Sequence, residues 1–264
     1  MRLIYPADTF RPKVVDETYE EEYEAAKEAG FSVSLFNFEE FQAGSFKVFP
    51  PIEAGEVTLY RGWMMTGPEY TRFHQALTTR GASPLTTPEE YLKCHHLPGW
   101  YDLLKPFTAE TRFYTEADDI AADLASVGWT GCFMKDYVKS LSTDGGSVVS
   151  DLSALESVIQ KMRKYRGQIE GGLCARHLED YDASTERRFF VFRGRAFGDG
   201  TEVPLPVREA ASQISSPFFT VDVAMRCDGV LRIIELGDGQ VSDRKHWDSH
   251  DFVRVLGDVK SALK

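Results

Sequence analysis

The stretch FFTVDVAMRCDGVLRIIELGDGQVSD, which begins at position 218, constrains the fold of this chain more than any other. Two runs rich in β-branched and aromatic residues, 218–226 and 230–236, flank the dipeptide Asp228-Gly229. Asp-Gly is typical of a two-residue type I′ turn, because both central residues of that turn need a positive φ. The stretch therefore predicts a β-hairpin with a fixed register.

In that register two carboxylates, Asp222 and Glu235, lie directly opposite one another on one face of the hairpin. Like charges in this arrangement destabilise a sheet by about 0.2–1 kcal/mol. A divalent cation between them would make the pairing favourable, and Mg²⁺ is commonly held by one or two carboxylates together with phosphate oxygens. Two interpretations stay open from the hairpin alone: a metal site, or two solvated acids whose register is shifted by a bulge.

Composition and charge limit the class of protein. The chain has 264 residues, 42% of them hydrophobic, so it can bury a large core. Its net charge of −11 argues against a general nucleic-acid-binding protein. The four cysteines form no C-x-x-C motif, and no apolar run reaches the roughly 18 residues of a membrane span. We expect a cytoplasmic protein with reduced thiols and with neither a membrane segment nor a nucleic-acid partner.

Strand and helix patterns alternate over the first 88 residues. Strand patterns at 2–5, 31–38 and 56–65 are separated and followed by helix patterns at 15–29 and 68–80. This alternation predicts a small parallel α/β unit. Arg61 lies toward the C-terminal end of the third strand pattern and precedes Gly62, at the kind of strand end where open α/β sheets bind ligands. Arg61 is therefore a candidate to hold a substrate anion.

Two lysines and a glycine-rich loop follow in the middle of the chain. Lys135 and Lys139 project to one face of a strand expected over 131–141. The loop after it contains Ser142, Gly145 and Gly146, and such loops let backbone N–H groups approach phosphate oxygens. The alternative is a solvated edge strand with a turn.

A third cation, Arg188, lies in the strand pattern ERRFFVF, directly before apolar residues expected in the core. An inward Arg188 needs an anion, which can be a phosphate, a substrate carboxylate or an acid on a neighbouring strand. At the end of the hairpin, Glu235, Asp238 and Asp243 crowd beside two glycines, which suits a cation–phosphate site.

The order of these features resembles the ATP-grasp superfamily, in particular the small bacterial and phage members of its R2K type. The stretches that carry the resemblance are YRGWMM, KDYVKS, TERRFFVFRG and the hairpin. The resemblance implies an α/β protein of α+β lobes with the ATP-grasp fold. It also implies three parts: a Rossmann-like pre-ATP-grasp domain at 1–88, a small central lobe at 89–170, and a C-terminal lobe at 171–264 that carries the metal-binding hairpin.

The resemblance further implies a site for ATP. Lys135 matches the lysine that reaches the α- and β-phosphates, and the loop 140–147 matches the lid over them. The strand LCARHLE matches the hinge whose backbone reads adenine, followed by an acid for the ribose hydroxyls. The implied nucleotide-binding residues are Lys135, Ser142, Gly145, Gly146, Ala175, Arg176, His177, Leu178, Glu179 and Asp180.

Metal and catalytic roles follow from the same resemblance. Asp222 and Glu235 match the acids that hold Mg²⁺, and the usual E-x-N reads E-L-G here, so Asp238 is the candidate to replace the missing asparagine. Arg188 matches the arginine that steadies an acyl phosphate. The implied catalytic residues are Arg188, Arg61 and Lys139. The first ATP lysine of the family has no clear match; the candidates are Lys93, Lys105 and His96.

The function implied is ATP-dependent ligation of a carboxylate to an amine or thiol through an acyl phosphate, in reactions that include the formation of peptide-like bonds. The alternatives are a nucleotide-binding module with reduced catalysis and a phosphotransferase on the same fold. The sequence identifies neither the carboxylate nor the nucleophile, which can be small molecules or peptides, and it does not indicate the oligomeric state.

Overall fold

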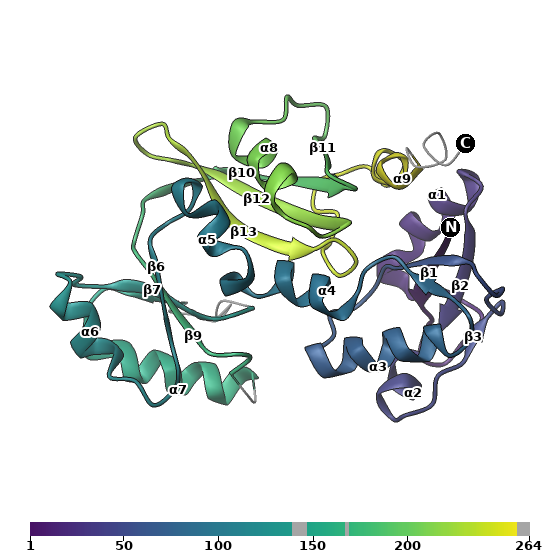
Figure 1. Ribbon diagram of the computed structural model, residues 1–264, viewed down its shortest axis with the longest axis horizontal. Helices are drawn as coiled ribbons and strands as arrows, with labels where there is room; N and C mark the ends of the chain where they lie inside the picture. The colour runs from purple at the N-terminus through teal and green to yellow at the C-terminus, as the bar shows by residue number, and fades with distance from the viewer. Residues whose placement is uncertain (139–146, 167–168, 258–264) are drawn as a thin grey trace. The chain divides into compact units, whose positions relative to one another are not determined.

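A computed structural model describes residues 1–138, 147–166 and 169–257 (Figure 1). The chain divides into two units, the first formed by 1–94, 188–221 and 237–264 and the second by 95–187 and 222–236. The three-part division at 88 and 170 remains a prediction beside this description. Among the described residues, no helix combines the length and the apolar character needed to cross a membrane.

The first unit begins with a five-stranded sheet in the order β3-β2-β1-β4-β5. Its strands are β1 (Arg2–Pro6), β2 (Ser32–Phe36), β3 (Val48–Phe49), β4 (Val57–Tyr60) and β5 (Ser83–Pro84). All neighbours pair in parallel except β3, which is antiparallel to β2. The helices of this segment are α1 (Glu20–Glu28), α2 (Phe38–Gln42), α3 (Gly67–Thr78) and α4 (Pro88–His95), with a 3-10 turn at Glu17–Tyr19. The predicted parallel α/β unit is confirmed.

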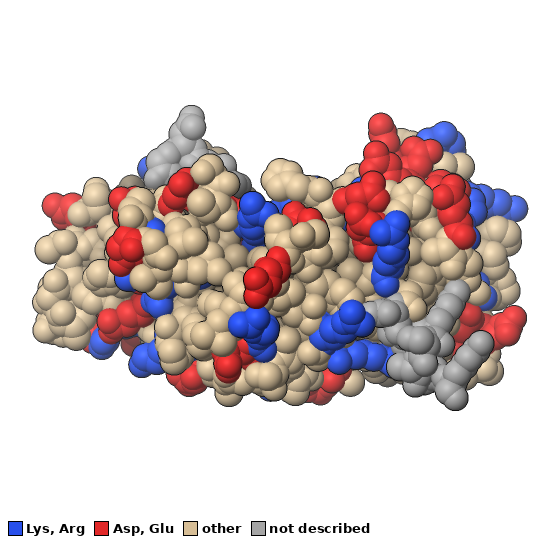
Figure 2. Space-filling model, turned by 90° about the horizontal axis from the view of Figure 1, so that it is seen from above, with Lys and Arg blue, Asp and Glu red and all other residues tan. Residues whose placement is uncertain are grey.

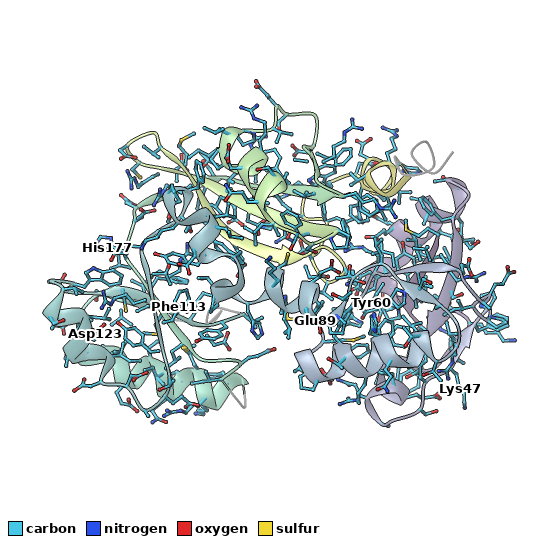
Figure 3. All side chains as sticks on the ribbon, in the orientation of Figure 1. Lys47, Tyr60, Glu89, Phe113, Asp123 and His177 are labelled. Atoms are coloured by element: carbon cyan, nitrogen blue, oxygen red, sulfur yellow. The ribbon has the colours of Figure 1, made fainter. Side chains whose placement is uncertain are left out.

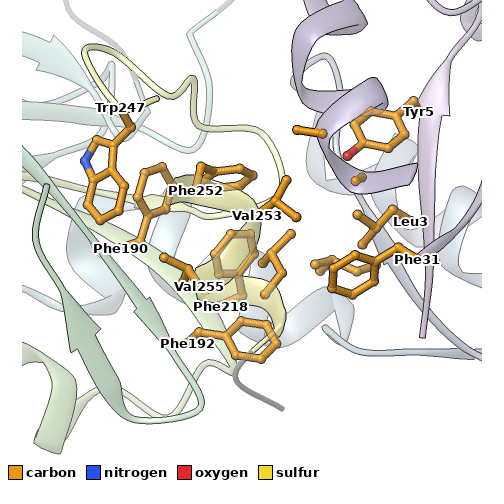
Figure 4. Packing of buried hydrophobic residues seen from close by; sticks show 14 of the residues in the cluster. Leu3, Tyr5, Phe31, Phe190, Phe192, Phe218, Trp247, Phe252, Val253 and Val255 are labelled. Carbon is orange, nitrogen blue, oxygen red and sulfur yellow. The ribbon is translucent and has the colours of Figure 1, made fainter. Parts of the chain in front are cut away.

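Later segments complete the first unit. They include β11 (Arg195–Phe197), α8 (Leu205–Gln213) and α9 (Ser249–Gly257). Phe190, Phe218 and Phe252 pack around one another in a buried cluster that also contains Leu3 and Phe31 from the N-terminal segment (Figure 4). The last segment of this unit is therefore built into the same core as its first strand.

The second unit holds a four-stranded sheet in the order β6-β9-β7-β8. Its strands are β6 (Thr111–Tyr114), β7 (Cys132–Asp136), β8 (Val148–Val149) and β9 (Leu173–Arg176). Its helices are α5 (Tyr101–Leu104), α6 (Ile120–Ser126) and α7 (Leu155–Arg166), with 3-10 turns at Leu97–Gly99, Lys105–Phe107 and Leu152–Ala154. The apolar faces of α6 and α7 pack on one face of the sheet. That packing leaves the opposite face of β7 and β9 for other contacts.

A further sheet has the order β11-β10-β12-β13, where β10 is Tyr181–Phe192, β12 is Phe218–Arg226 and β13 is Leu231–Asp238. The β12–β13 hairpin forms as predicted, but the prediction of a two-residue turn is wrong. The Arg226 N–H donates to Val230 O at 2.9 Å, and the Gly229 N–H donates to Arg226 O at 2.8 Å. Gly229 has a φ of 86°, so the turn has three residues and ends in a glycine bulge.

This turn shifts the register on which the facing of the two acids depended. Continued along the strands, it would set Asp222 opposite Ile234 rather than Glu235. At the far end the Gly239 N–H donates to Phe218 O at 3.0 Å, in the register first expected. Eight positions separate Phe218 from Arg226 and nine separate Val230 from Gly239, so β13 carries one extra residue between the two bonds. The bulged alternative therefore describes the hairpin better than the straight ladder.

Four predicted strands are longer than the observed ones. The patterns at 31–38 and 56–65 form strands only over Ser32–Phe36 and Val57–Tyr60. The strand expected over 131–141 ends at Asp136, whose side chain accepts from the Val138 N–H at 2.9 Å and so turns the chain away from the sheet. The strand expected over 173–178 ends at Arg176. On the face seen in Figure 2, acidic and basic side chains are interspersed, with no continuous basic surface on that face.

Candidate active site

An ion pair joins β7 to β13 in the second unit. Along β7, Cys132 and Met134 belong to the core under α6 and α7, so Phe133 and Lys135 face the opposite side. There Lys135 Nζ lies 2.6 Å from Glu235 Oε1. The lysine side chain is 5% exposed and the glutamate side chain is 43% exposed. The cation of the pair is therefore buried, while solvent reaches the carboxylate.

A pocket of about 320 Å³ opens beside this pair. Its walls are Lys135 and Phe133 from β7, Arg176 from β9, Tyr181 from β10, and Ile234 and Glu235 from β13. His177, which follows β9 and is labelled in Figure 3, also lines it. Glu186 and Ala109 complete the lining, so the pocket combines aromatic and aliphatic walls with two cations and two carboxylates, a mixture expected of a site for a charged ligand with a flat ring.

Two other hollows of the second unit are larger, about 360 and 640 Å³. Both are lined by Asp118 and Asp119, and their arginines are already paired: Arg163 with Glu116 at 2.7 Å and Arg112 with Asp123 at 2.8 Å. Acidic walls repel phosphates. The smaller pocket at Lys135 is therefore the better candidate for an anionic ligand.

Arg176 is held rigidly at the back of this pocket. Its Nη1 donates to Ile234 O at 2.6 Å and its Nη2 donates to Thr108 Oγ1 at 2.7 Å. Its Nε is buried and has no hydrogen-bond partner among the described residues. Burial lowers the pKa of this guanidinium. A buried donor without a partner is costly, and a bound ligand could supply the missing acceptor.

The residues after β9 were predicted to form an adenine hinge, with Glu179 or Asp180 for the ribose. Ala175 is buried, and the His177 N–H donates to Glu110 O at 2.7 Å, whereas His177 and Leu178 are exposed. The Asp180 carbonyl accepts from the Cys227 N–H at 2.9 Å. The hinge is thus tied by its backbone and leaves two side chains at the surface.

Glu179 has protein partners of its own. It accepts from Arg226 Nη1 and Arg232 Nη2, both at 3.0 Å, and from the Tyr181 hydroxyl. Burial alone would raise its pKa, but these bonds and the two positive charges hold the pKa below its usual value. The arginine contacts occupy the carboxylate that was expected to face a ribose. The role of Glu179 toward a nucleotide remains a prediction.

Of the acids predicted to hold a metal, Asp222 is 2% exposed and does not line the pocket, whereas Glu235 does. The charge of Glu235 is balanced by Lys135. No group of three or more His, Cys, Asp or Glu residues suited to a metal occurs among the described residues. The hairpin thus offers carboxylate oxygens without a complete protein cage.

Asp238, the third predicted metal ligand, lies in the first unit and is fully buried. Its Oδ1 accepts from the backbone N–H of Gln240 at 2.9 Å and from the side-chain amide at 3.0 Å, while its Oδ2 has no partner in the described part of the chain. Burial raises the pKa of this carboxyl to about 7, against the bonds from Gln240.

Gly237 stands where the family has an asparagine, and the packing around it explains the difference. A Cβ at this position would approach Ser242 Oγ to 2.7 Å and Thr220 Oγ1 to 3.0 Å. Ser242 in turn donates to Asp238 O at 2.8 Å. The serine and threonine hydroxyls therefore fill the space that an asparagine side chain would need.

The two arginines predicted to act in catalysis both lie in the first unit. Arg188 donates to the Asp243 carboxylate at 2.8 Å and to the Asp243 carbonyl at 2.9 Å. The anion that pairs with Arg188 is therefore an acid of the protein, from the loop after β13. Arg61 is 1% exposed and pairs with Glu22. Arg61 follows β4 directly, as expected of a residue at a strand end, and its role toward a substrate anion remains a prediction.

Several predicted residues remain without a structural account. Lys139, Ser142, Gly145 and Gly146 lie outside the described residues.

Of the candidates for the first lysine, Lys93 donates to Ser215 Oγ at 2.9 Å and Lys105 lies 5.8 Å from the centre of the Tyr101 ring. His96 Nε2 lies 3.5 Å from a Glu170 carboxylate oxygen. None of these three lines the pocket at Lys135.

Sequence reasoning missed the apolar walls of the pocket. Phe133 lies two positions before Lys135 and so shares its face of β7, which is a signal the alternation of a strand provides. Tyr181 and Ile234 carried no comparable signal. Their place depends on how β10 and β13 approach the second sheet, which no local pattern encodes.

Comparison with known proteins identifies the class of this arrangement. The chain shares its fold with solved ATP-grasp enzymes, and residues 99–256 match the model of an ATP-grasp domain, R2K clade family 3. The chain therefore belongs to the R2K clade of the ATP-grasp superfamily, in its third family.

Solved structures support the same fold over nearly the whole chain. A D-cycloserine synthetase, DcsG, has a TM-score of 0.67 at 14% identity and covers 98% of this chain and 99% of its own. A RimK-domain ATP-grasp protein of Sphaerobacter thermophilus has a TM-score of 0.64 at 15% identity, over 97% and 99% of the two chains. D-alanyl-alanine synthetase A of Vibrio cholerae has a TM-score of 0.65 at 10% identity, over 99% of each chain. No curated protein matches the sequence.

Proposed function

We propose that this protein is an ATP-dependent ligase that joins a carboxylate to an amine through an acyl phosphate. The observation that carries the proposal is the Lys135–Glu235 pair at the wall of a pocket of about 320 Å³ that also contains Arg176 and the hinge. A lysine and an arginine beside a carboxylate, under aromatic and aliphatic walls, offer separate places for phosphates, a cation and a base.

Lys135 and Glu235 hold each other in the ligand-free protein. Lys135 would be the positive partner of the ATP phosphates, and Glu235 would be one of the carboxylates that hold a divalent cation. Asp222 on the neighbouring strand is the second carboxylate. Two carboxylates without a third protein ligand fit Mg²⁺ that is held jointly with phosphate oxygens, since Mg²⁺ keeps few protein ligands in such sites. When bound, the cation neutralises charge on the phosphates.

The reaction then needs no covalent intermediate on the protein. The γ-phosphoryl group leaves ADP and bonds to an oxygen of the carboxylate, which gives an acyl phosphate. The amine attacks the carbonyl carbon, inorganic phosphate leaves, and the amine gives up a proton. Arg188 steadies the acyl phosphate, because a planar guanidinium matches phosphate oxygens and keeps its charge at neutral pH.

The similar structures indicate the range of substrates to test. They include a D-cycloserine synthetase, a D-alanine–D-alanine ligase, the ATP-grasp ligase PsnB with a minimal precursor, and the macrocyclase MdnC with a precursor peptide. One of them was solved with ATP and another with Mg and ADP. We therefore infer amino acids and peptides as the first candidates for both substrates.

Trapping with hydroxylamine tests the proposal directly. The protein is incubated with Mg·ATP, a set of amino acids and peptides as carboxylates, and hydroxylamine as a generic nucleophile. An acyl phosphate gives a hydroxamate with equal amounts of ADP and inorganic phosphate. A product that retains the phosphoryl group on a hydroxyl would instead indicate a phosphotransferase. Tight ATP binding with no ADP release for any acid would indicate a binding module with reduced catalysis.

A further inference from the structure

Arg61 and Glu22 form a buried ion pair in the first unit. Arg61 Nε donates to Glu22 Oε1 and Arg61 Nη2 donates to Glu22 Oε2, both at 2.8 Å. The two side chains are 1% and 2% exposed. Glu22 comes from α1 and Arg61 follows β4, so the pair joins a helix to the end of a strand.

The third nitrogen of Arg61 holds the loop that follows β13. Nη1 donates to the carbonyl oxygens of Gly239 and Ser242, the second at 2.9 Å. The Gly239 backbone can come this close because position 239 has no side chain; a Cβ there would approach the Phe218 ring to 2.6 Å. The Phe252 ring covers the guanidinium at 4.5 Å from its centroid.

These contacts leave Arg61 no free side for a substrate anion. Every guanidinium nitrogen donates to the protein, and one face of the group lies against an aromatic ring. The geometry instead assigns Arg61 to the loop 239–243. An arginine suits this task because its donors point in fixed directions in one plane, so it can bind a carboxylate and two carbonyls at once.

The same loop holds the candidate catalytic arginine. Asp243, the residue after Ser242, accepts from Arg188 Nη1 through its carboxylate at 2.8 Å and through its carbonyl at 2.9 Å. The Arg188 carbonyl accepts from Trp247 Nε1 at 2.9 Å. Contacts thus run without a gap from Glu22 through Arg61 and the loop carbonyls to the Arg188 guanidinium, all within the first unit.

We propose that Glu22 and Arg61 form a clamp that positions Arg188 for catalysis by fixing the loop 239–243. Glu22 fixes the orientation of Arg61, Arg61 fixes the loop, and the loop presents Asp243 to Arg188. Neither clamp residue touches a substrate, so both are positioning residues. This inference rests on the proposed function for the part that Arg188 plays in turnover.

Three variants separate positioning from stability. Glu22→Gln removes the charge and keeps the size. Glu22→Leu with Arg61→Met replaces the ion pair by an apolar pair, which buried sites often tolerate, and removes the donors to the loop. Glu56→Gln is the matched control, because Glu56 pairs with Arg2 at 2.7 Å in the same unit and neither residue contacts the loop.

Turnover is then measured in two backgrounds, the parent and Arg188→Ala. We expect the Leu–Met double variant to melt near the parent, to keep its KM for ATP and to lose at least tenfold in kcat. In the Arg188→Ala background the same change should cost less than twofold, because the residue through which the clamp acts is already absent. Glu56→Gln should leave kcat within twofold of the parent.

Equal losses in both backgrounds would show that the clamp acts on the fold and not through Arg188, and would overturn the proposal. Hydrogen exchange over 237–247 gives a readout that needs no turnover. Faster exchange of this segment in both clamp variants, but not in Glu56→Gln, supports the clamp even where the parent shows no ligase activity, in which case the proposed function alone fails. Unchanged exchange in the clamp variants overturns the clamp.

Discussion

Two buried cations of this protein have opposite surroundings. Arg61 in the first unit and its partner Glu22 are enclosed on all sides, at 1% and 2% exposure. Lys135 in the second unit is equally buried at 5%, but its partner Glu235 is 43% exposed at the wall of a pocket. We call Arg61–Glu22 the closed pair and Lys135–Glu235 the half-open pair. A ligand can reach the half-open pair in the folded protein, but it cannot reach the closed pair.

The difference suggests how to separate structural from ligand-binding ion pairs in this fold. Each guanidinium nitrogen of Arg61 donates to the protein, so the group is not available to a ligand. Among the described residues, Lys135 pairs with one carboxylate, which solvent can reach, so phosphate oxygens can replace it. The exposure of the acidic partner, more than the burial of the cation, therefore distinguishes the ligand-binding ion pair from the structural one.

The largest effect should come from breaking the closed pair. Arg61→Met alone removes the nearer cation of the buried Glu22 and leaves only Arg244 Nε, 3.7 Å from its carboxylate, so we expect a loss of about 3 kcal/mol in the free energy of unfolding. Glu22→Leu added to it should recover most of that loss. Urea denaturation of the two variants measures both values, and a single variant as stable as the parent would contradict the enclosure described here.

The half-open pair should respond in turnover more than in stability. Glu235→Gln should reduce Mg-dependent turnover by at least about 100-fold, or about 2.7 kcal/mol, because an amide is a poor ligand for a hard dication. Asp222→Asn should act in the same direction. Steady-state kinetics over a range of Mg²⁺ concentrations measure this effect. Near-parental turnover in both variants would show that these two carboxylates do not hold a metal ion needed for the reaction.

The structure also reverses one expectation for Glu235. Two opposed acids would make the ligand-free protein more stable on loss of one charge. Because Lys135 already neutralises Glu235, Glu235→Gln should lower the melting temperature of the ligand-free protein slightly. A clear rise would restore the picture of two repelling carboxylates.

A buried acid should make the stability of the protein depend on pH. The pKa of Asp238 is raised to about 7 by burial, well above its value in the unfolded chain, so the folded state holds a proton that the unfolded state has lost. Stability should be fully present below about pH 4 and fall as the pH rises toward 7, by up to about 1.4 kcal/mol per pH unit.

The charged and titratable groups around Asp238 set the control for this test. Arg61 lowers the pKa of Asp238 and Glu90 raises it. Besides burial, the charge of Asp238 in turn raises the pKa of Tyr70 and of Cys94. Asp238→Asn should flatten the decline between pH 4 and pH 7 while Glu90→Gln leaves it in place. An unchanged slope in Asp238→Asn would show that another group is responsible.

The smallest effect belongs to a surface pair. Lys27 and Glu24 lie 2.8 Å apart on α1 with side chains 44% and 52% exposed. Water screens such a pair, so Glu24→Gln should change the free energy of unfolding by less than about 0.5 kcal/mol. A larger loss would weaken the link between enclosure and stability on which the comparison of the two buried pairs depends.

The sequence predicted much of this fold because its strongest patterns are local. Alternating strands and helices gave the parallel sheet, and the spacing of Asp222, Glu235 and the Asp-Gly turn gave the hairpin. The register failed because a glycine in a turn fits both a two-residue turn and a bulge, and only the hydrogen bonds at Arg226 distinguish them.

The partners of the charged residues were harder to predict. Glu22 lies among many acids in the first helix, yet it shares the buried face with Ala25 and Ala26, a helical spacing that could have identified it. No comparable signal connects Lys135 to Glu235 or Arg61 to the Gly239 carbonyl, because about 100 and 178 positions separate them. Such contacts are set by how whole elements pack.

The central claim is that the pocket at Lys135 binds Mg·ATP, and thermal melting with and without Mg·ATP tests it most directly. At a hundredfold excess over Kd, ligand binding should stabilise the parent by about 2.7 kcal/mol. Lys135→Ala should lose most of this gain at the same ATP concentration, while Glu56→Gln, which does not line the pocket, should keep it. A parent whose melting temperature does not respond to saturating Mg·ATP, or a full response in Lys135→Ala, would contradict the account.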